Sequence, residues 1–190
     1  TEHGLAHAKR SSDVARQILQ SLGYDDRTCE LAAIAGYMHD IGNVVNRSDH
    51  AQSGALMAFT ILNKMQMHPA EIALVVAAIG NHDEGTASAV NPIAAALILS
   101  DKSDVRRSRV RDKETVAADI HDRVNYAVER SELEIHLENR TVVLNIVIDT
   151  TICPVMEYFE IFLTRMVLCR KAAQFLDLQF ELMINDTRLL

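Results

Sequence analysis

The feature that most limits the fold of this chain is residues 29–40, CELAAIAGYMHD, which carry no formal charge between Glu30 and Asp40. A helix with so little polar surface is stable only inside a protein, so we expect this segment to form a central, buried helix. It ends in His39-Asp40, and Gly42 follows as a stop signal. An imidazole and a carboxylate at the buried end of a helix require other groups that compensate their polarity.

Three further histidines and one aspartate stand on, or at the end of, other apolar helical segments. They are His7, His50, His82 and Asp101. The apolar stripe of the first predicted helix, which ends at Gly23, passes back through His7 and turns it toward the core. Asp101 lies four residues after Leu97 and therefore on the apolar face of its own helix. Five helical segments thus end in, or carry, groups that a core does not accept alone.

The periodicity of the sequence predicts a helical part followed by a smaller mixed unit. After the first helix, further helices are predicted over residues 29–40, 50–65, 70–79, 93–109 and 113–129. Residues 133–137 alternate like a strand, a turn follows, and the β-branched residues 141–148 predict a second strand covered on both faces. A helix from Pro154 to about residue 176 and a strand over 180–184 complete the chain. We predict a mainly α fold, with a helical bundle over residues 1–128 and a small α+β unit over 129–190 (β-hairpin, helix, strand).

The net charge limits the kinds of binding partner that we expect, and the cysteine content indicates the cellular compartment. A formal net charge of -7 argues against duplex nucleic acid or an anionic membrane as the main partner, because both require a basic face. The cysteines Cys29, Cys153 and Cys169 form no Cys-x-x-Cys pair, so neither a disulfide framework nor a thiolate zinc site is indicated. The apolar runs are too short for a membrane span, and we find no signal peptide. A reducing cytoplasm is the simplest location.

The joint pattern of histidines and aspartates favours a metal site. Taken singly, a helical histidine is most often an ordinary core or surface residue, and an aspartate near a helix end is most often a cap. One shared cation, however, compensates several buried imidazoles and carboxylates at once. Histidine and carboxylate without thiolate suit Mn, Fe, Co, Ni or Zn. We expect two divalent ions, Fe or Mn first, with Ni, Co, Zn or Mg as alternatives.

The adjacent His39 and Asp40 are positioned to serve both ions. The two oxygens of Asp40 would bridge ions about 3.5–4 Å apart. The first ion would be completed by His7, His39 and Asp101, and the second by His50 and His82. A water shared by the ions would become hydroxide near neutral pH and attack phosphorus. Asp40 and Asp101 are the catalytic candidates, and Asp101 or Asp83 would assist proton transfer.

Several segments, in order, carry a resemblance to a known family. They are AAIAGYMHDIGN around the His-Asp pair, DHAQSGALMAFTIL at His50, AIGNHDEG at His82 and LILSDKSDVRRSR at Asp101, with His7 placed by its distance from the pair. Over residues 1–110 the chain therefore resembles the HD superfamily of metal-dependent phosphohydrolases. The resemblance implies an all-helical bundle, a divalent-metal site and hydrolysis of phosphate esters, commonly those of nucleotides.

The chain departs from one branch of that superfamily. The HD-GYP branch, which cleaves cyclic dinucleotides, has a Gly-Tyr-Pro segment after its histidine pair, whereas this chain continues from His82 into GTASAVNP. The same branch has a lysine where Asn43 stands here. We therefore do not expect cleavage of cyclic di-GMP.

Other polar residues are candidates for supporting roles. Lys102 and Arg106 follow Asp101 within about one helical turn and are candidates for binding substrate phosphate, although a solvated face is the ordinary role of such a cluster. Asn43, Asp83 and Glu84 are expected to support the ligands from behind, Glu84 through His82. His3 lies four residues before His7 and could replace it as a ligand.

The sequence therefore predicts a phosphohydrolase that cleaves a small-molecule phosphate monoester or diester, with a nucleotide as the first candidate. One alternative is a catalytically silent regulatory module that binds metal and nucleotide. Another is a metal-free helical interaction protein. The apolar surface of the helix after Pro154 is wider than one stripe, so we also expect a homodimer through the C-terminal unit.

Overall fold

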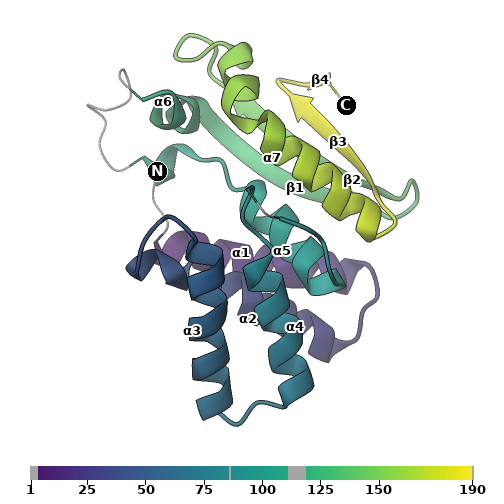
Figure 1. Cartoon of the computed structure of the whole chain (residues 1–190). Helices are drawn as coiled ribbons and strands as arrows, with labels where there is room; N and C mark the ends of the chain where they lie inside the picture. Colours follow the sequence, from purple (N-terminus) through teal and green to yellow (C-terminus); the bar gives the residue numbers. More distant parts are fainter. Residues whose placement is uncertain (1–3, 86, 111–118, 190) are drawn as a thin grey trace.

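The computed structural model describes residues 4–85, 87–110 and 119–189 and shows a mainly helical chain that ends in a small sheet (Figure 1). The helical part contains α1 (Leu5–Ser21), α2 (Asp26–Met38), α3 (His50–Lys64), α4 (Pro69–Gly80) and α5 (Pro92–Lys102). A 3-10 helix, η1 (Ile41–Val44), joins α2 to α3, and a second, η2 (Arg107–Arg109), follows α5. The predicted fold class, a helical bundle followed by an α+β unit, is confirmed.

The central helix is α5 rather than α2. Every residue of α5 from Ile93 to Lys102 is buried, because it contacts α1, α2 and α4 on one side and α7 of the C-terminal unit on the other. The segment that the sequence placed at the centre is buried on one side only, and Tyr37 of α2 keeps 49% of its surface exposed. An uncharged run of small residues therefore indicated close helix packing rather than burial all round.

Two glycines allow the close approaches that shape the site. A Cβ on Gly36 would lie 2.7 Å from the carbonyl oxygen of Ser11, so this glycine lets α2 press against α1. A Cβ on Gly42 would lie 2.0 Å from the carbonyl oxygen of His50, which is incompatible with any side chain. These contacts bring the end of α2 against the first half of α1, and η1 against the start of α3.

The helix predicted over residues 93–109 ends at Lys102. The hydroxyl of Ser103 donates to the carbonyl of Ser100, and the backbone turns at Asp104, whose N–H donates to the carbonyl of Asp101. Side chains that bond to nearby backbone compete with helix continuation in this way. The predicted helix 113–129 lies partly outside the described residues, and within them α6 covers Ile120–Ala127.

The C-terminal unit is a sheet in the order β1-β2-β3-β4 with one helix across it. Its strands are β1 (Val128–His136), β2 (Thr141–Ile148), β3 (Gln179–Ile184) and β4 (Thr187–Arg188), and α7 (Val155–Phe175) lies between β2 and β3 in sequence. The pairs β1–β2 and β3–β4 are antiparallel, whereas β2 and β3 are parallel because α7 carries the chain back. The short β4 was not predicted.

Within the sheet, one face is more deeply buried than the other. Leu133, Leu144 and Leu182 lie side by side in register, and Leu144 and Leu182 have no exposed surface. On the other face of β2, Asn145 and Val147 keep intermediate exposure, so the strand is not fully covered on both sides as predicted. The β-branched composition of residues 141–148 therefore indicated a strand but did not indicate how far its second face is covered.

The wide apolar surface of α7 is largely used within the chain. The helix lies across one face of the sheet in Figure 1, and its contacts are with β3, α6 and the central helix α5. The sheet on one side of α7, and α5 on another, therefore bury most of the apolar surface from which we predicted a second subunit. Within the described ranges, no helix combines the length and apolarity that a membrane span requires.

Candidate metal centre

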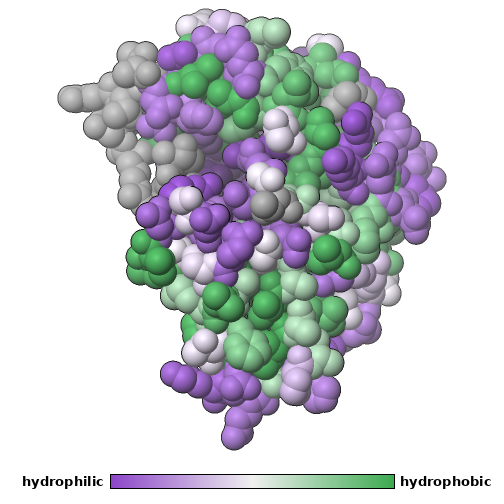
Figure 2. All heavy atoms as spheres, in the orientation of Figure 1, coloured by the Kyte–Doolittle hydropathy of each residue, from purple (hydrophilic) through white to green (hydrophobic). Residues whose placement is uncertain are grey.

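Four buried histidines from separate helical segments converge in the helical part. His7 lies in the first turn of α1, His39 ends α2, His50 begins α3, and His82 follows α4. None of the four keeps more than 2% of its surface exposed. In Figure 1 the start of α3 and the end of α4 lie at the same level, next to α5. Figure 2 shows hydrophilic side chains gathered near this level and apolar ones over α3 and α4 below it.

The Nδ1 atom of each ring faces an oxygen acceptor. The acceptors are the carbonyl of Gly36 for His39 (2.7 Å), that of Arg47 for His50 (3.1 Å), that of Ile79 for His82 (2.6 Å) and the carboxylate of Asp104 for His7 (2.7 Å). A carbonyl oxygen only accepts, so Nδ1 carries the ring proton and Nε2 of the neutral ring keeps a free lone pair. All four rings are therefore oriented with a potential metal ligand, Nε2, toward the interior.

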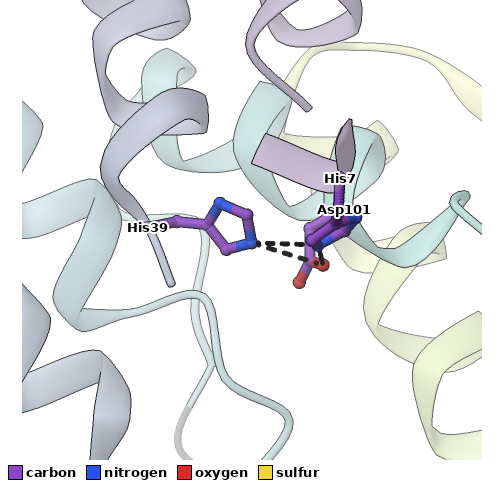
Figure 3. A group of neighbouring side chains, drawn as sticks. All are labelled: His7, His39 and Asp101. Carbon is purple, nitrogen blue, oxygen red and sulfur yellow. Dashed lines mark hydrogen bonds and ion pairs between the residues drawn. The ribbon is translucent and has the colours of Figure 1, made fainter. Parts of the chain in front are cut away.

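These Nε2 atoms lie within hydrogen-bond distance of one another, so each pair requires a proton or a metal ion between its two nitrogens. The Nε2 atoms of His7 and His39 are 3.2 Å apart, and those of His50 and His82 are also 3.2 Å apart. Asp101 adds a carboxylate oxygen 3.1 Å from Nε2 of His7. Figure 3 shows His7, His39 and Asp101 directed toward one another from three different elements. Lone pairs at this distance repel unless a proton or a metal ion lies between them.

Asp40 faces both pairs of histidines. Its Oδ2 lies 3.4 Å from Nε2 of His39 and 3.6 Å from Nε2 of His7, whereas its Oδ1 lies 3.4 Å from Nε2 of His50. Ligands bonded to one ion at about 2.0–2.2 Å are separated by about 3.0–3.4 Å, so these spacings fit metal coordination. Two groups of three residues each place their ligand atoms within 4.8 Å of one another. The first is His7, His39 and Asp101, and the second is His39, Asp40 and His82. The donor set and its spacing fit a divalent metal.

Burial and the two carboxylates, Asp40 and Asp101, set the pKa values of His39 and His82 in this cluster. Burial alone would lower the pKa of His39, but the ion pairs with Asp101 and Asp40 raise it to about 10. Burial and the neighbouring His39 lower the pKa of His82 to about 3, so His82 is neutral. Burial opposes ionisation of Asp101, yet Lys102, His39 and His7 hold its pKa well below the usual value. The two carboxylates thus favour positive charge next to His39, which suits a site for a divalent cation.

Asp104 supports His7 and was not singled out by the sequence. Its fully buried carboxylate accepts from Nδ1 of His7 and from the guanidinium of Arg106, and Arg10 pairs with it at 3.2 Å. Burial would raise the pKa of Asp104, but the hydrogen bonds from His7 and Arg106 lower it. The available signal was an acidic residue three positions after Asp101 at the edge of a basic cluster.

The predicted phosphate-binding residues are engaged with carboxylates. Nζ of Lys102 lies 2.7 Å from Oδ2 of Asp101, and this side chain is almost fully buried. The guanidinium of Arg106 binds Asp104. Arg47 was not predicted from the sequence as part of the site, yet its Nη1 lies 3.3 Å from Nε2 of His50 and 3.7 Å from Oδ1 of Asp40.

The three residues expected to support the ligands occupy different places. Asn43 donates from Nδ2 to Oδ1 of Asp40 at 2.7 Å, as a supporting residue would. The carboxylate of Asp83, about one third exposed, lies 3.9 Å from Nε2 of His50. Glu84 accepts from Arg165 of α7 at 2.9 Å and lies 3.8 Å from Lys102 of α5, so these contacts direct it toward α7 and α5 rather than toward His82. His3 lies outside the described residues.

An apolar groove of about 810 Å³ borders the metal-facing residues. It runs between α1, α2 and the end of α3, and Asp40 is one of its lining residues. Most of the other lining residues are apolar, among them Leu5, Ile34 and Met38. An apolar part of a bound molecule would find contact surface there.

The comparisons with known proteins agree with this geometry over the helical part. A family model described as the HD domain matches residues 4–127, which include all six converging side chains and end next to β1. No curated protein and no solved structure matches the chain.

Proposed function

Because the chain belongs to the family of HD domains, whose members are generally metal-dependent hydrolases, we propose that it hydrolyses a small-molecule phosphate ester at the converging histidines and aspartates. The observation that carries this proposal is the convergence of four Nε2 atoms and two carboxylates, in two groups that share Asp40. A site built only to stabilise the fold would not direct so many lone pairs toward one another.

The ligand roles follow from the contacts. We propose that His7, His39 and Asp101 hold one ion, that His50 and His82 hold a second, and that Asp40 bridges them. When bound, such ions acidify a water and take up charge on the phosphoryl oxygens. The Nδ1 contacts orient each imidazole before an ion arrives, which lowers the cost of assembling the site. Fe and Mn are the first candidates for this N/O donor set.

The two aspartates considered for proton transfer differ in their surroundings. Asp101 is paired with Lys102 and with the histidines, and its low pKa keeps it ionised, which suits a ligand. Asp83 lies next to His50 and is more exposed than Asp101. We therefore propose Asp83 rather than Asp101 as the residue that accepts a proton from, or returns one to, the reacting groups.

The finer substrate proposal is a nucleotide. It rests on the family, and the apolar groove beside Asp40 offers surface on which a base could lie.

Two structural proposals concern the C-terminal unit. The first is a boundary between the two units near Val128, where α6 passes into β1. The second is a homodimer through the C-terminal unit, for which Met156, Leu163 and Phe175 of α7 remain exposed. Light scattering coupled to sizing chromatography tests the dimer, and a monomer would reject it.

The function is tested by metal analysis and phosphate release on the same preparation. Protein purified without chelator should contain at least one equivalent of divalent metal and release phosphate from one member of a panel that includes nucleotides, aryl and alkyl phosphates, and generic phosphodiesters. Metal-bound protein that binds a nucleotide but never hydrolyses it would support a regulatory module instead. Protein with no affinity for Mn²⁺ or Fe²⁺ would refute the metal site.

A further inference from the structure

Arg47 contacts both sides of one candidate ligand. Its carbonyl oxygen accepts from Nδ1 of His50 at 3.1 Å, and its guanidinium Nη1 lies 3.3 Å from Nε2 of the same ring. Nη1 also lies 3.3 Å from Oδ1 of Asn43 and 3.7 Å from Oδ1 of Asp40. The backbone of Arg47 therefore orients the imidazole, and its side chain covers the atom with which His50 would bind metal.

The guanidinium is positioned where positive charge is required, but it is not fixed there. The guanidinium contacts Nε2 of His50 and Oδ1 of Asp40, which are the atoms proposed to bind the ion. Metal binding must therefore displace the guanidinium from both atoms. The side chain keeps 56% of its surface exposed and stands in the segment between η1 and α3, so it can turn outward without disturbing a packed helix. Its contact with Asn43 involves no metal-facing atom and can hold it beside the ions.

The neighbouring cations are already engaged with protein carboxylates. Lys102 is buried against Asp101, and Arg165 binds Glu84. Arg10 and Arg106 both pair with Asp104, on the other side of His7 from the ions. Within residues 4–85, 87–110 and 119–189, Arg47 is the only cation seen to combine an exposed side chain with contacts to Nε2 of His50 and to Asp40.

We propose that Arg47 binds the phosphate of the substrate, in the role first assigned to Lys102 and Arg106, once metal has displaced its guanidinium from His50. This inference rests on the proposed function and adds the residue that recognises the anion. A guanidinium binds two phosphate oxygens at once, which a lysine ammonium does not do with the same geometry. Arg47 would therefore fix the orientation of the phosphate as well as neutralise it.

The test measures binding of inorganic phosphate to Mn²⁺-loaded protein by calorimetry. In Arg47→Ala the affinity for phosphate should fall roughly 10- to 100-fold, the usual range for losing hydrogen bonds to a charged group. Its affinity for Mn²⁺ should be equal to or higher than that of the wild type, because a competing cation has been removed. Arg47→Gln, which keeps most of the length but not the charge, should behave in the same way. Arg16→Ala, at an exposed position on α1 outside this cluster, is the matched control and should bind both as the wild type does.

Each other outcome decides against one of the two proposals. Unchanged phosphate affinity in both Arg47 variants would overturn the inference and leave the proposed function intact. Weaker Mn²⁺ binding together with a lower melting temperature would show that the side chain of Arg47 supports the fold around His50 rather than the bound anion, which also overturns the inference. A wild-type protein that binds no Mn²⁺ would refute the proposed function itself. If Arg47→Ala does not fold, the result for Arg47→Gln decides.

Discussion

Replacing Asp104 by asparagine tests a residue that orients a proposed metal ligand but does not itself bind the ion. Asp104 touches no proposed ion, yet its carboxylate accepts from Nδ1 of His7 at 2.7 Å while Nε2 of that ring faces the site. The Asp104→Asn side chain has the same shape, but its uncharged amide accepts more weakly from Nδ1 and can turn its NH2 group toward the ring, so the orientation and the basicity of His7 are both less well supported. Removing such a supporting carboxylate costs about 10- to 100-fold in metal affinity. That loss corresponds to about 1.4–2.7 kcal/mol.

The same change should also lower the free energy of unfolding. Asp104 is fully buried and paired with Arg10 and Arg106, so its removal leaves their positive charges without a partner. Breaking a buried pair typically costs about 3–5 kcal/mol, and we expect the lower end because both arginines are about one third exposed.

The assay is titration of metal-free protein with Mn²⁺ by calorimetry, combined with chemical denaturation in chelator. Asp13→Asn is the matched control, because Asp13 is an exposed acid on the same helix as His7. Asp104→Asn should bind Mn²⁺ more weakly than this control and unfold at lower denaturant. Wild-type Mn²⁺ affinity in Asp104→Asn would refute the argument that the His7 orientation depends on this carboxylate.

Three further predictions concern the bridge, the C-terminal unit and pH. Asp40→Asn should lose turnover on the order of a thousandfold, since a carboxamide cannot bridge two ions, with little change in melting temperature; unchanged metal content and rate would contradict the bridging role. Arg165→Ala removes the nearer of the two cations beside Glu84 and should lower kcat by a few-fold with metal content unchanged, the scale of a partly exposed ion pair; Glu84→Gln should lower kcat at least as far, and no effect in either variant would show that this contact does not couple the two units. In metal-free protein the raised pKa of His39 contributes stability that is fully present below about pH 6.5 and is lost as pH rises toward 10; melting temperatures measured in chelator across that range should fall. For the same reason, binding of metal near pH 7 should release about one proton, measurable in two buffers of different ionisation enthalpy, and no release would show that His39 is neutral.

The sequence by itself determined the secondary structure classes and the set of groups that converge. Burial of an imidazole or a carboxylate is so costly that a polar residue at the end of an apolar helix predicts a partner. This reasoning selected the six side chains before any contact between them was known. The change from helical to alternating periodicity near residue 130 likewise predicted the C-terminal sheet. Its limit was local: the helix through Asp101 stops at Lys102, because Ser103 and Asp104 bond to nearby groups instead of extending it.

Only the tertiary structure decided which charges are paired with which. His7 meets Asp104 across 97 positions of sequence, and Glu84 meets Arg165 across 81. Contacts of this kind depend on how helices cross, and one such crossing is that of α1 and α2, where Gly36 allows close approach of the backbones. Periodicity gives the face on which a residue lies but not the helix that it meets. Arg47 is a different case: it lies only three residues before His50 but outside every predicted helix, so periodicity gave its side chain no direction, and only the folded chain shows it beside Nε2 of His50.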